Sequence, residues 1–255
     1  MHKLGLKLWS TNDYYIKHAL SLYDDDLYDY IELYAVPDSY EDFISKWKEI
    51  KIPFIIHAPH FLGGLNFSKR EYFDKNVNLA GQALKYADAL RSKFVIFHPG
   101  IGGEIKETAR QINLIKDSRI IIENKPYFAV NKKYICNGSS PEEISFVVNE
   151  CAVGFCLDIG HCFCSANAKD IDPMLYLQEF LKIGPSVVHI SDGHYKGLED
   201  DHLHLGHGNF DLTNILMLVD KISNITIETD KDSKENLEDF RQDAYFLKNI
   251  LELKR

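Results

Sequence analysis

The chain of 255 residues has few cysteines, no long apolar run and fewer basic than acidic residues. Its five cysteines are odd in number and scattered, which excludes a disulfide framework and leads us to expect a cytoplasmic location. No apolar stretch approaches the roughly 18–20 residues of a membrane-spanning helix, and we expect no signal peptide. With 29 Lys and Arg against 38 Asp and Glu, the net charge of −9 argues against a nucleic-acid-binding protein.

A recurring pattern is present instead, in which a short apolar run precedes a segment of helical period. The runs span 4–9, 30–35, 54–59, 94–99, 119–125, 153–161, 187–192 and 225–230. The helical segments span 12–22, 39–50, 69–90, 104–114, 141–151, 172–182, 212–221 and 234–253. Eight such units predict a (β/α)8 barrel formed as one domain by residues 1–255. The alternative, an open doubly wound sheet, lacks its usual glycine-rich nucleotide-binding motifs.

Histidine is concentrated at or just after the expected strand ends, where nine of the 11 histidines lie: His57, His60, His98, His161, His189, His194, His202, His204 and His207. Carboxylates share these positions: Glu123, Asp158, Asp192, Asp200, Asp201 and Glu228. The carboxyl ends of all barrel strands open onto one face, which is where active sites form. We therefore expect these side chains to converge at the mouth of the barrel.

Such a cluster of carboxylates is costly to bury unless it is paired or binds a metal. Lys125 is the one cation close to it in the sequence. Any single member has an ordinary alternative, such as a helix cap or a surface ion pair, so the prediction depends on the whole set. The set predicts one to three divalent ions, with zinc, manganese and magnesium as candidates.

Six short motifs follow one another at or after the expected strand ends, from the fourth run to the eighth: FHPG (97–100), IENKP (122–126), CLDIGH (156–161), VHISD (188–192), DDHLHLGHGN (200–209) and IETD (227–230). This succession resembles the xylose-isomerase-like barrel superfamily, which includes endonuclease IV and many sugar isomerases and epimerases. The resemblance implies an active site at the carboxyl ends of the strands. It also implies a metal site with four ligands, Glu123, Asp158, His189 and Glu228.

The resemblance leaves two enzymatic hypotheses, of which the first is a metal-dependent isomerase or epimerase of a sugar or sugar phosphate. In that case Glu123 and Glu228 are the acid and base on either side of the substrate. The expected substrate-binding residues are His57, His60, His161 and His207. Trp9, Phe61 and Tyr127 would supply apolar walls.

The second hypothesis is a zinc phosphodiesterase like endonuclease IV, which hydrolyses DNA at abasic sites. His98 would then join Glu123 on a first zinc, and His161, Asp200 and His202 would hold further ions. Two departures count against it and make nucleic acid the less favoured partner. Asn66 stands nine residues after His57, where the endonuclease pattern has a histidine ligand, and the loop 36–42 is short and acidic. A non-catalytic barrel that binds a metal or a ligand is the third alternative.

Overall fold

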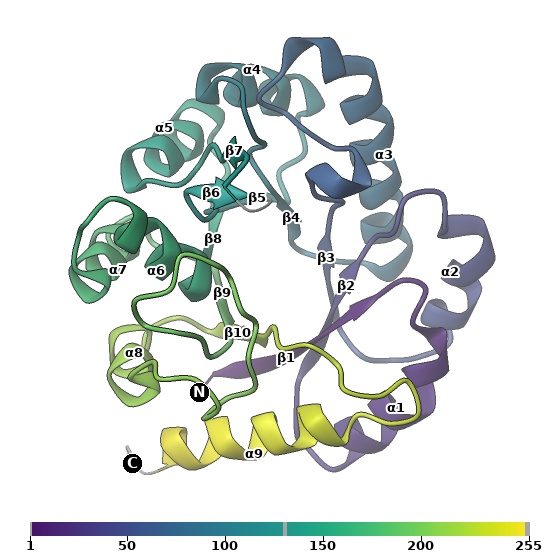
Figure 1. The fold of residues 1–255 in the computed structure, drawn as a ribbon. Coiled ribbons are helices and arrows are strands. Elements are labelled where there is room, and N and C mark those ends of the chain that lie inside the picture. The colour runs from purple at the N-terminus through teal and green to yellow at the C-terminus, as the bar shows by residue number, and fades with distance from the viewer. Residues whose placement is uncertain (1, 130–131, 253–255) are drawn as a thin grey trace.

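Each of the eight apolar runs overlaps a strand of a closed parallel barrel, which confirms the predicted fold (Figure 1). The computed structural model describes residues 2–129 and 132–252. The barrel strands, in chain order, are β1 (Lys3–Trp9), β2 (Tyr30–Tyr34), β3 (Phe54–His57), β4 (Val95–Phe97), β5 (Ile120–Glu123), β8 (Gly154–Asp158), β9 (Val187–Ile190) and β10 (Asn224–Ile227). The ring closes through pairing of β1 with β10. Every neighbouring pair in the ring is parallel, so all the strands point the same way.

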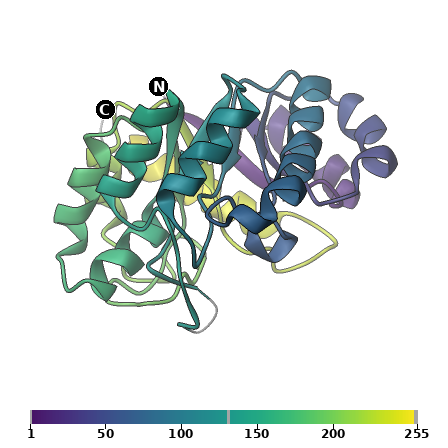
Figure 2. The same cartoon turned by 90° about the horizontal axis from the view of Figure 1, so that it is seen from above.

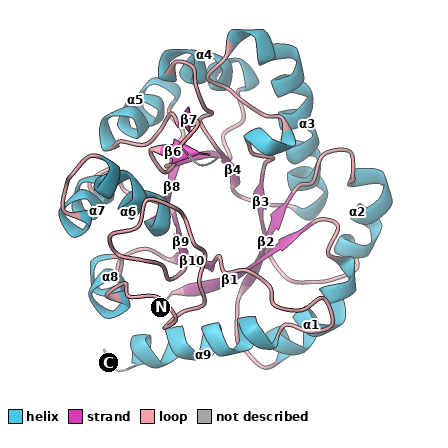
Figure 3. Ribbon diagram, in the orientation of Figure 1, coloured by secondary structure: helices cyan, strands magenta, loops and turns pink. Residues whose placement is uncertain are grey.

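Helices follow the strands and form an outer ring around the barrel (Figure 3). They are α1 (Ile16–Asp24), α2 (Tyr40–Lys48), α3 (Phe73–Leu90), α4 (Ile105–Ile115), α5 (Pro141–Cys151), α6 (Ile159–Ala168), α7 (Pro173–Leu181), α8 (Leu212–Leu218) and α9 (Glu238–Glu252). The start of α5 is capped by Ser140, whose side chain accepts a hydrogen bond from the Glu143 backbone N–H. Among the helices described, none is long and apolar enough to cross a membrane.

One predicted strand is too long. The run 153–161 contains β8 only as far as Asp158, and α6 begins at the next residue. The Asp158 side chain caps this helix by accepting a hydrogen bond from the His161 backbone N–H at 2.7 Å. Because strand and helix are both buried here, hydrophobicity does not reveal the boundary between them. His161 therefore lies in the first turn of α6 rather than on a strand.

A short hairpin that the sequence did not predict follows β5. It consists of β6 (Phe128–Ala129) paired antiparallel with β7 (Tyr134–Ile135). Figure 2 shows that it projects from the barrel. It extends the wall of the mouth beside the end of β5.

The interior of the barrel has an apolar layer below and a polar layer directly above it. The apolar layer is a cluster of buried residues: Tyr30, Ile55, Ile96, Ile121, Cys156 and Val187. Side chains alternate along a strand, so the next inward residue lies two positions further on. Those positions hold Glu32, His57, His98, Glu123, Asp158 and His189, all of them buried. The same step on β1 and β10 leads from Gly5 and Thr226 to Lys7 and Glu228.

Candidate metal centre

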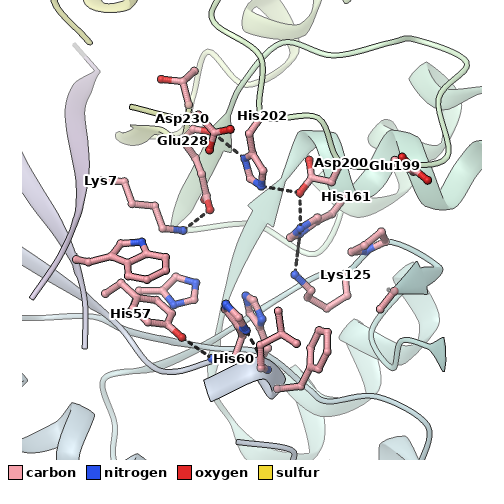
Figure 4. Close-up of a pocket in the computed structure, with 18 of the residues that line it drawn as sticks. Lys7, His57, His60, Lys125, His161, Glu199, Asp200, His202, Glu228 and Asp230 are labelled. Atoms are coloured by element: carbon pink, nitrogen blue, oxygen red, sulfur yellow. Dashed lines mark hydrogen bonds and ion pairs between the residues drawn. The ribbon is translucent and has the colours of Figure 1, made fainter. Parts of the chain in front are cut away.

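A cavity of about 780 Å³ lies at the carboxyl ends of the strands (Figure 4), and Lys7, His57, His98 and Glu228 of the polar layer line it. Its walls carry aromatic side chains, among them Trp9, Tyr34 and Phe61. The lining also includes five lysines: Lys7, Lys125, Lys132, Lys231 and Lys234. The cavity is of the size that encloses a small molecule.

Glu123 lies at the centre of the polar layer and is 1% exposed. Its Oε2 is 3.0 Å from His57 Nε2 and 3.1 Å from His98 Nε2. Its Oε1 is 3.1 Å from His161 Nδ1. Burial alone would raise the pKa of Glu123, but the surrounding histidines, His98 foremost, hold that pKa well below its ordinary value. Glu123 is therefore a carboxylate that faces ring nitrogens on two sides.

His189 brings the other predicted ligands together. Its Nδ1 is 2.7 Å from Glu228 Oε2, 3.6 Å from Glu123 Oε2 and 3.7 Å from Asp158 Oδ2. Burial would lower the pKa of His189, but Cys156, Glu32 and Glu228 outweigh it and raise the pKa well above its ordinary value. The four residues that the resemblance implied as ligands thus meet around a single ring nitrogen.

Asp200 joins two further histidines at the upper edge of the cluster (Figure 4). Its Oδ2 is 3.0 Å from His161 Nε2 and 2.8 Å from His202 Nε2. Burial opposes the charged form of both rings, but Asp158 and Asp200 raise the pKa of His161 to about 9. Asp200 likewise raises the pKa of His202 to about 10. Each ring has its Nδ1 next to a backbone carbonyl, Asn124 O for His161 and Glu228 O for His202, so each Nε2 faces Asp200.

His57 and His98 form a third group with Glu123. His57 Nδ1 is 2.7 Å from Ala58 O, and since a carbonyl only accepts, this nitrogen carries the proton and Nε2 faces Glu123. Burial lowers the pKa of His98 well below its ordinary value despite the nearby Glu123 charge. Within the described chain, neither ring nitrogen of His98 has a hydrogen-bond partner.

The donors fit a divalent cation. Among the described residues, five groups have ligand atoms within 4.8 Å of one another: His57, His98 and Glu123; Glu123, Asp158 and His161; Glu32, His189 and Glu228; Glu123, Cys156 and His189; and, away from the barrel axis, His204, Asp232 and Asp239. Buried atoms that lack a hydrogen bond among the residues described include His98 Nδ1 and Nε2, His189 Nδ1 and Glu228 Oε2. Buried polar atoms are rarely left unpaired, and imidazole and carboxylate donors suit zinc and manganese.

Two charged residues that sequence reasoning missed complete the polar layer. Lys7 Nζ contacts Glu228 Oε1 and lies 3.4 Å from Glu32 Oε1, so Lys125 is not the only cation beside the cluster. Lys7 and Glu32 are direct neighbours in the register of β1 and β2. A signal was available, because strands of a parallel barrel are buried on both faces and a charged residue inside one has to serve the interior.

Of the four predicted substrate-binding residues, three line the cavity and one does not. His57, His60 and His161 line the cavity, whereas His207 is exposed and lies outside its lining. A turn explains the position of His207, whose N–H bonds to His204 O after Gly206 adopts φ +87°. Burial lowers the pKa of His60 to about 3, and its Nδ1 accepts from the Leu62 backbone N–H.

Of the predicted apolar walls, Trp9 and Phe61 line the cavity and Tyr127 does not. Tyr127 packs instead against Phe128 of the hairpin, with ring centroids 4.7 Å apart. The aromatic wall is therefore built mainly from the β1 side of the mouth.

Asn66 is buried in a loop network rather than directed at the cluster. Its Nδ2 donates to Ile101 O at 3.0 Å, and its Oδ1 accepts from Ile101 N at 3.0 Å and from Ser68 Oγ at 2.8 Å. The connection from β2 to α2 is only residues 35–39. Both departures from the endonuclease pattern are thus present in the structure.

Comparisons with known proteins agree with this architecture. Residues 19–250 match the family described as a xylose isomerase-like TIM barrel. A "Probable endonuclease 4" of Aquifex aeolicus is 28% identical over 189 residues, 65% of this chain and 65% of the relative, so slightly less than two thirds of the relative's length is covered. A D-tagatose 3-epimerase-like protein has a similar fold, with TM-score 0.72 and 21% identity over 98% of this chain and 97% of that one. Endonuclease IV from Thermus thermophilus is similar in fold to the same degree, with TM-score 0.71 and 20% identity over 98% and 99%.

Proposed function

The chain belongs to the xylose isomerase-like TIM barrel family, and on that premise we propose that it is a divalent-metal-dependent isomerase or epimerase of a sugar or sugar phosphate. The observation that carries this proposal is the convergence of two glutamates, Glu123 and Glu228, on His189 at the mouth of the barrel, next to a cavity that Glu228 lines. Glu123 and Glu228 approach His189 from β5 and β10, which lie three places apart in the ring. They thereby reach the same ring from two sides of the barrel.

Glu123, Asp158, His189 and Glu228 would hold the ion. When bound, a divalent ion supplies a Lewis acid that polarises hydroxyl and carbonyl oxygens and stabilises negative charge on them. Lys7 and His189 keep the pKa of Glu228 well below its ordinary value in spite of burial, so both glutamates are carboxylates at neutral pH. One of them removes a proton from a substrate carbon, and the other directs proton return from the opposite side.

The cavity walls suit a sugar. Trp9 is 52% exposed, and its ring lies 5.1 Å from that of Tyr34, which gives a broad aromatic surface for the apolar face of a sugar ring. Lys125 lies on the opposite side, with its Nζ 3.0 Å from His161 Nε2. This lysine is available to bind a substrate oxygen or a phosphate.

The proposal is tested by proton exchange. Ketohexoses, aldoses and their phosphates are incubated with zinc- or manganese-loaded protein in D₂O, and deuterium uptake at carbon is followed by NMR. We expect exchange with at least one sugar, and its loss in Glu123→Gln and in Glu228→Gln. Glu199→Gln is the matched control, because Glu199 lines the same cavity but is exposed and belongs to none of the candidate metal-binding groups. Metal-loaded protein that exchanges no proton on any of these sugars would refute the proposal.

The bridge formed by Asp200 between His161 and His202 favours a second candidate, a zinc phosphodiesterase that acts on abasic-site DNA. A duplex oligonucleotide with one abasic site tests it directly. Incision that disappears in Asp200→Asn would replace the isomerase with the hydrolase. The buried role of Asn66 and the short connection 35–39 are the reasons for which we expect no incision.

A further inference from the structure

Glu32 is a carboxylate in the middle of β2 with no exposed surface. Its Oε2 accepts a hydrogen bond from Thr226 Oγ1 at 2.7 Å and lies 2.9 Å from His189 Nε2. Thr226 Oγ1, having donated its proton to Glu32, accepts from Tyr30 O–H at 2.8 Å. Glu32 Oε1 lies 3.4 Å from the Lys7 ammonium, so both oxygens of Glu32 face donors, as those of a carboxylate do. A carboxylate only accepts, so the proton between Glu32 and His189 is on the imidazole.

That proton determines which nitrogen of His189 meets a metal. With Nε2–H directed at Glu32, Nδ1 is the nitrogen that faces Glu123, Asp158 and Glu228. A carboxylate behind a histidine ligand fixes the orientation of the ring and makes it a better donor. The β-sheet register supports the arrangement, because Thr226 and His189 are direct neighbours on β10 and β9.

Lys7 acts on the same layer from the other side of Glu32. Its ammonium contacts Glu228 Oε1, and Glu228 Oε2 is left facing His189 Nδ1. It also lies 3.4 Å from Glu32 Oε1, an atom without a hydrogen bond among the described residues. One positive charge therefore offsets two carboxylates next to the position of the ion.

We propose that Glu32 and Lys7 are an outer pair of positioning residues that tune the metal centre in opposite directions. Glu32 orients His189 and adds negative charge, which strengthens binding of a divalent cation. Lys7 fixes one oxygen of Glu228 and adds positive charge, which weakens it. The inference rests on the metal dependence of the proposed function but not on the choice between isomerase and hydrolase.

Zinc affinity measured at constant pH by competition with a chromogenic chelator tests the pair. We expect Glu32→Gln to weaken zinc binding by about 10–100-fold, as outer-shell changes do. We expect Lys7→Met to strengthen zinc binding by at least about tenfold, because a like charge a few ångströms from the ion is removed. Lys7→Arg, which keeps the charge, should return the affinity toward that of the wild type.

The opposite effects of Glu32→Gln and Lys7→Met on zinc affinity distinguish this role from a merely structural one. Loss of packing or of a buried hydrogen bond would leave zinc affinity unchanged or reduce it in every variant. Thr226→Val is the matched control, since it removes a hydrogen bond to Glu32 but keeps the Glu32 carboxylate beside His189. It should lower thermal stability and leave zinc affinity within about threefold. The absorption spectrum of the cobalt-loaded protein should change in Glu32→Gln and not in Thr226→Val.

The outcomes are distinguishable. If the wild type binds no zinc, the metal-dependent function fails together with this inference. If the wild type binds zinc but Lys7→Met weakens binding, or Glu32→Gln leaves it unchanged, the outer pair is refuted and the proposed function stands. Should Glu32→Gln fold poorly, the double variant with Lys7→Met, in which the buried charges balance again, gives the same comparison against Lys7→Met alone.

Discussion

The hydrogen bonds of Asn66 indicate that this residue stabilises the fold and does not bind the metal, and this can be tested quantitatively. The change is Asn66→Ala. It removes three hydrogen bonds, two with the backbone of Ile101 and one with Ser68 Oγ. Asn66 is 6% exposed and Ile101 is 8% exposed, so water does not readily replace the lost partners.

The cost follows from these contacts. A buried hydrogen bond contributes about 1 kcal/mol net, and leaving the Ile101 N–H unpaired adds to the loss, so we expect about 3–4 kcal/mol of destabilisation. For a chain near this size, each kcal/mol lowers Tm by about 2–4 °C. The variant should therefore melt about 6–16 °C below the wild type.

Differential scanning calorimetry of the metal-free proteins measures this shift, and chelator competition measures zinc stoichiometry. Asn78→Ala is the control, because Asn78 is exposed and, among the described residues, its side chain hydrogen-bonds only to Gln82; such surface changes stay within about 0.5 kcal/mol. Zinc stoichiometry should be the same in all three proteins. A normal Tm together with a lost zinc equivalent would show that position 66 serves the metal centre.

Three further predictions concern the cap of α5, a candidate ligand and pH. Ser140→Ala removes the N-cap of α5 and should cost about 1 kcal/mol in chemical denaturation; no change would contradict the assigned cap. Asp158→Asn keeps the cap of α6 but removes a charge, so zinc affinity should fall at least about tenfold while metal-free stability changes by less than about 1 kcal/mol; equal zinc affinity would remove Asp158 from the ligand set. The pKa of His161 is raised to about 9 and that of His202 to about 10, above the unfolded value of about 6.5. Their contribution is therefore complete below about pH 6.5 and lost as pH rises through 9 and 10, so the Tm of the metal-free protein should fall between pH 7 and 10. Zinc-loaded protein, in which the ion replaces those protons, should not show that fall.

The strands were predictable because a parallel barrel buries both faces of each strand, which leaves near-continuous apolar runs. All eight runs overlap a strand. The same property hid the start of α6, since Ile159 and its neighbours are as buried as the end of β8. Each strand of the hairpin, β6 and β7, has too few residues for the alternation of apolar and polar side chains to be recognised in the sequence.

Site residues could be predicted where a carboxylate or a histidine lies at the end of an apolar run. Glu123 and His189 follow apolar runs directly, and the alternation of strand side chains turns them inward. Lys7 and Glu32 were missed because each sits between apolar residues of a strand, where a single charged residue is ordinarily taken for a solvent-facing position. Only the register of β1 against β2 shows that the two charges pair inside the barrel.

Anomalous diffraction from crystals grown with zinc would show directly whether the polar layer of the barrel is a divalent metal centre. We expect a peak bound by His189 Nδ1 and by oxygens of Glu123, Asp158 and Glu228, at ligand distances of about 2.0–2.2 Å. Diffraction from zinc-saturated crystals with no anomalous peak inside the barrel mouth would contradict this expectation.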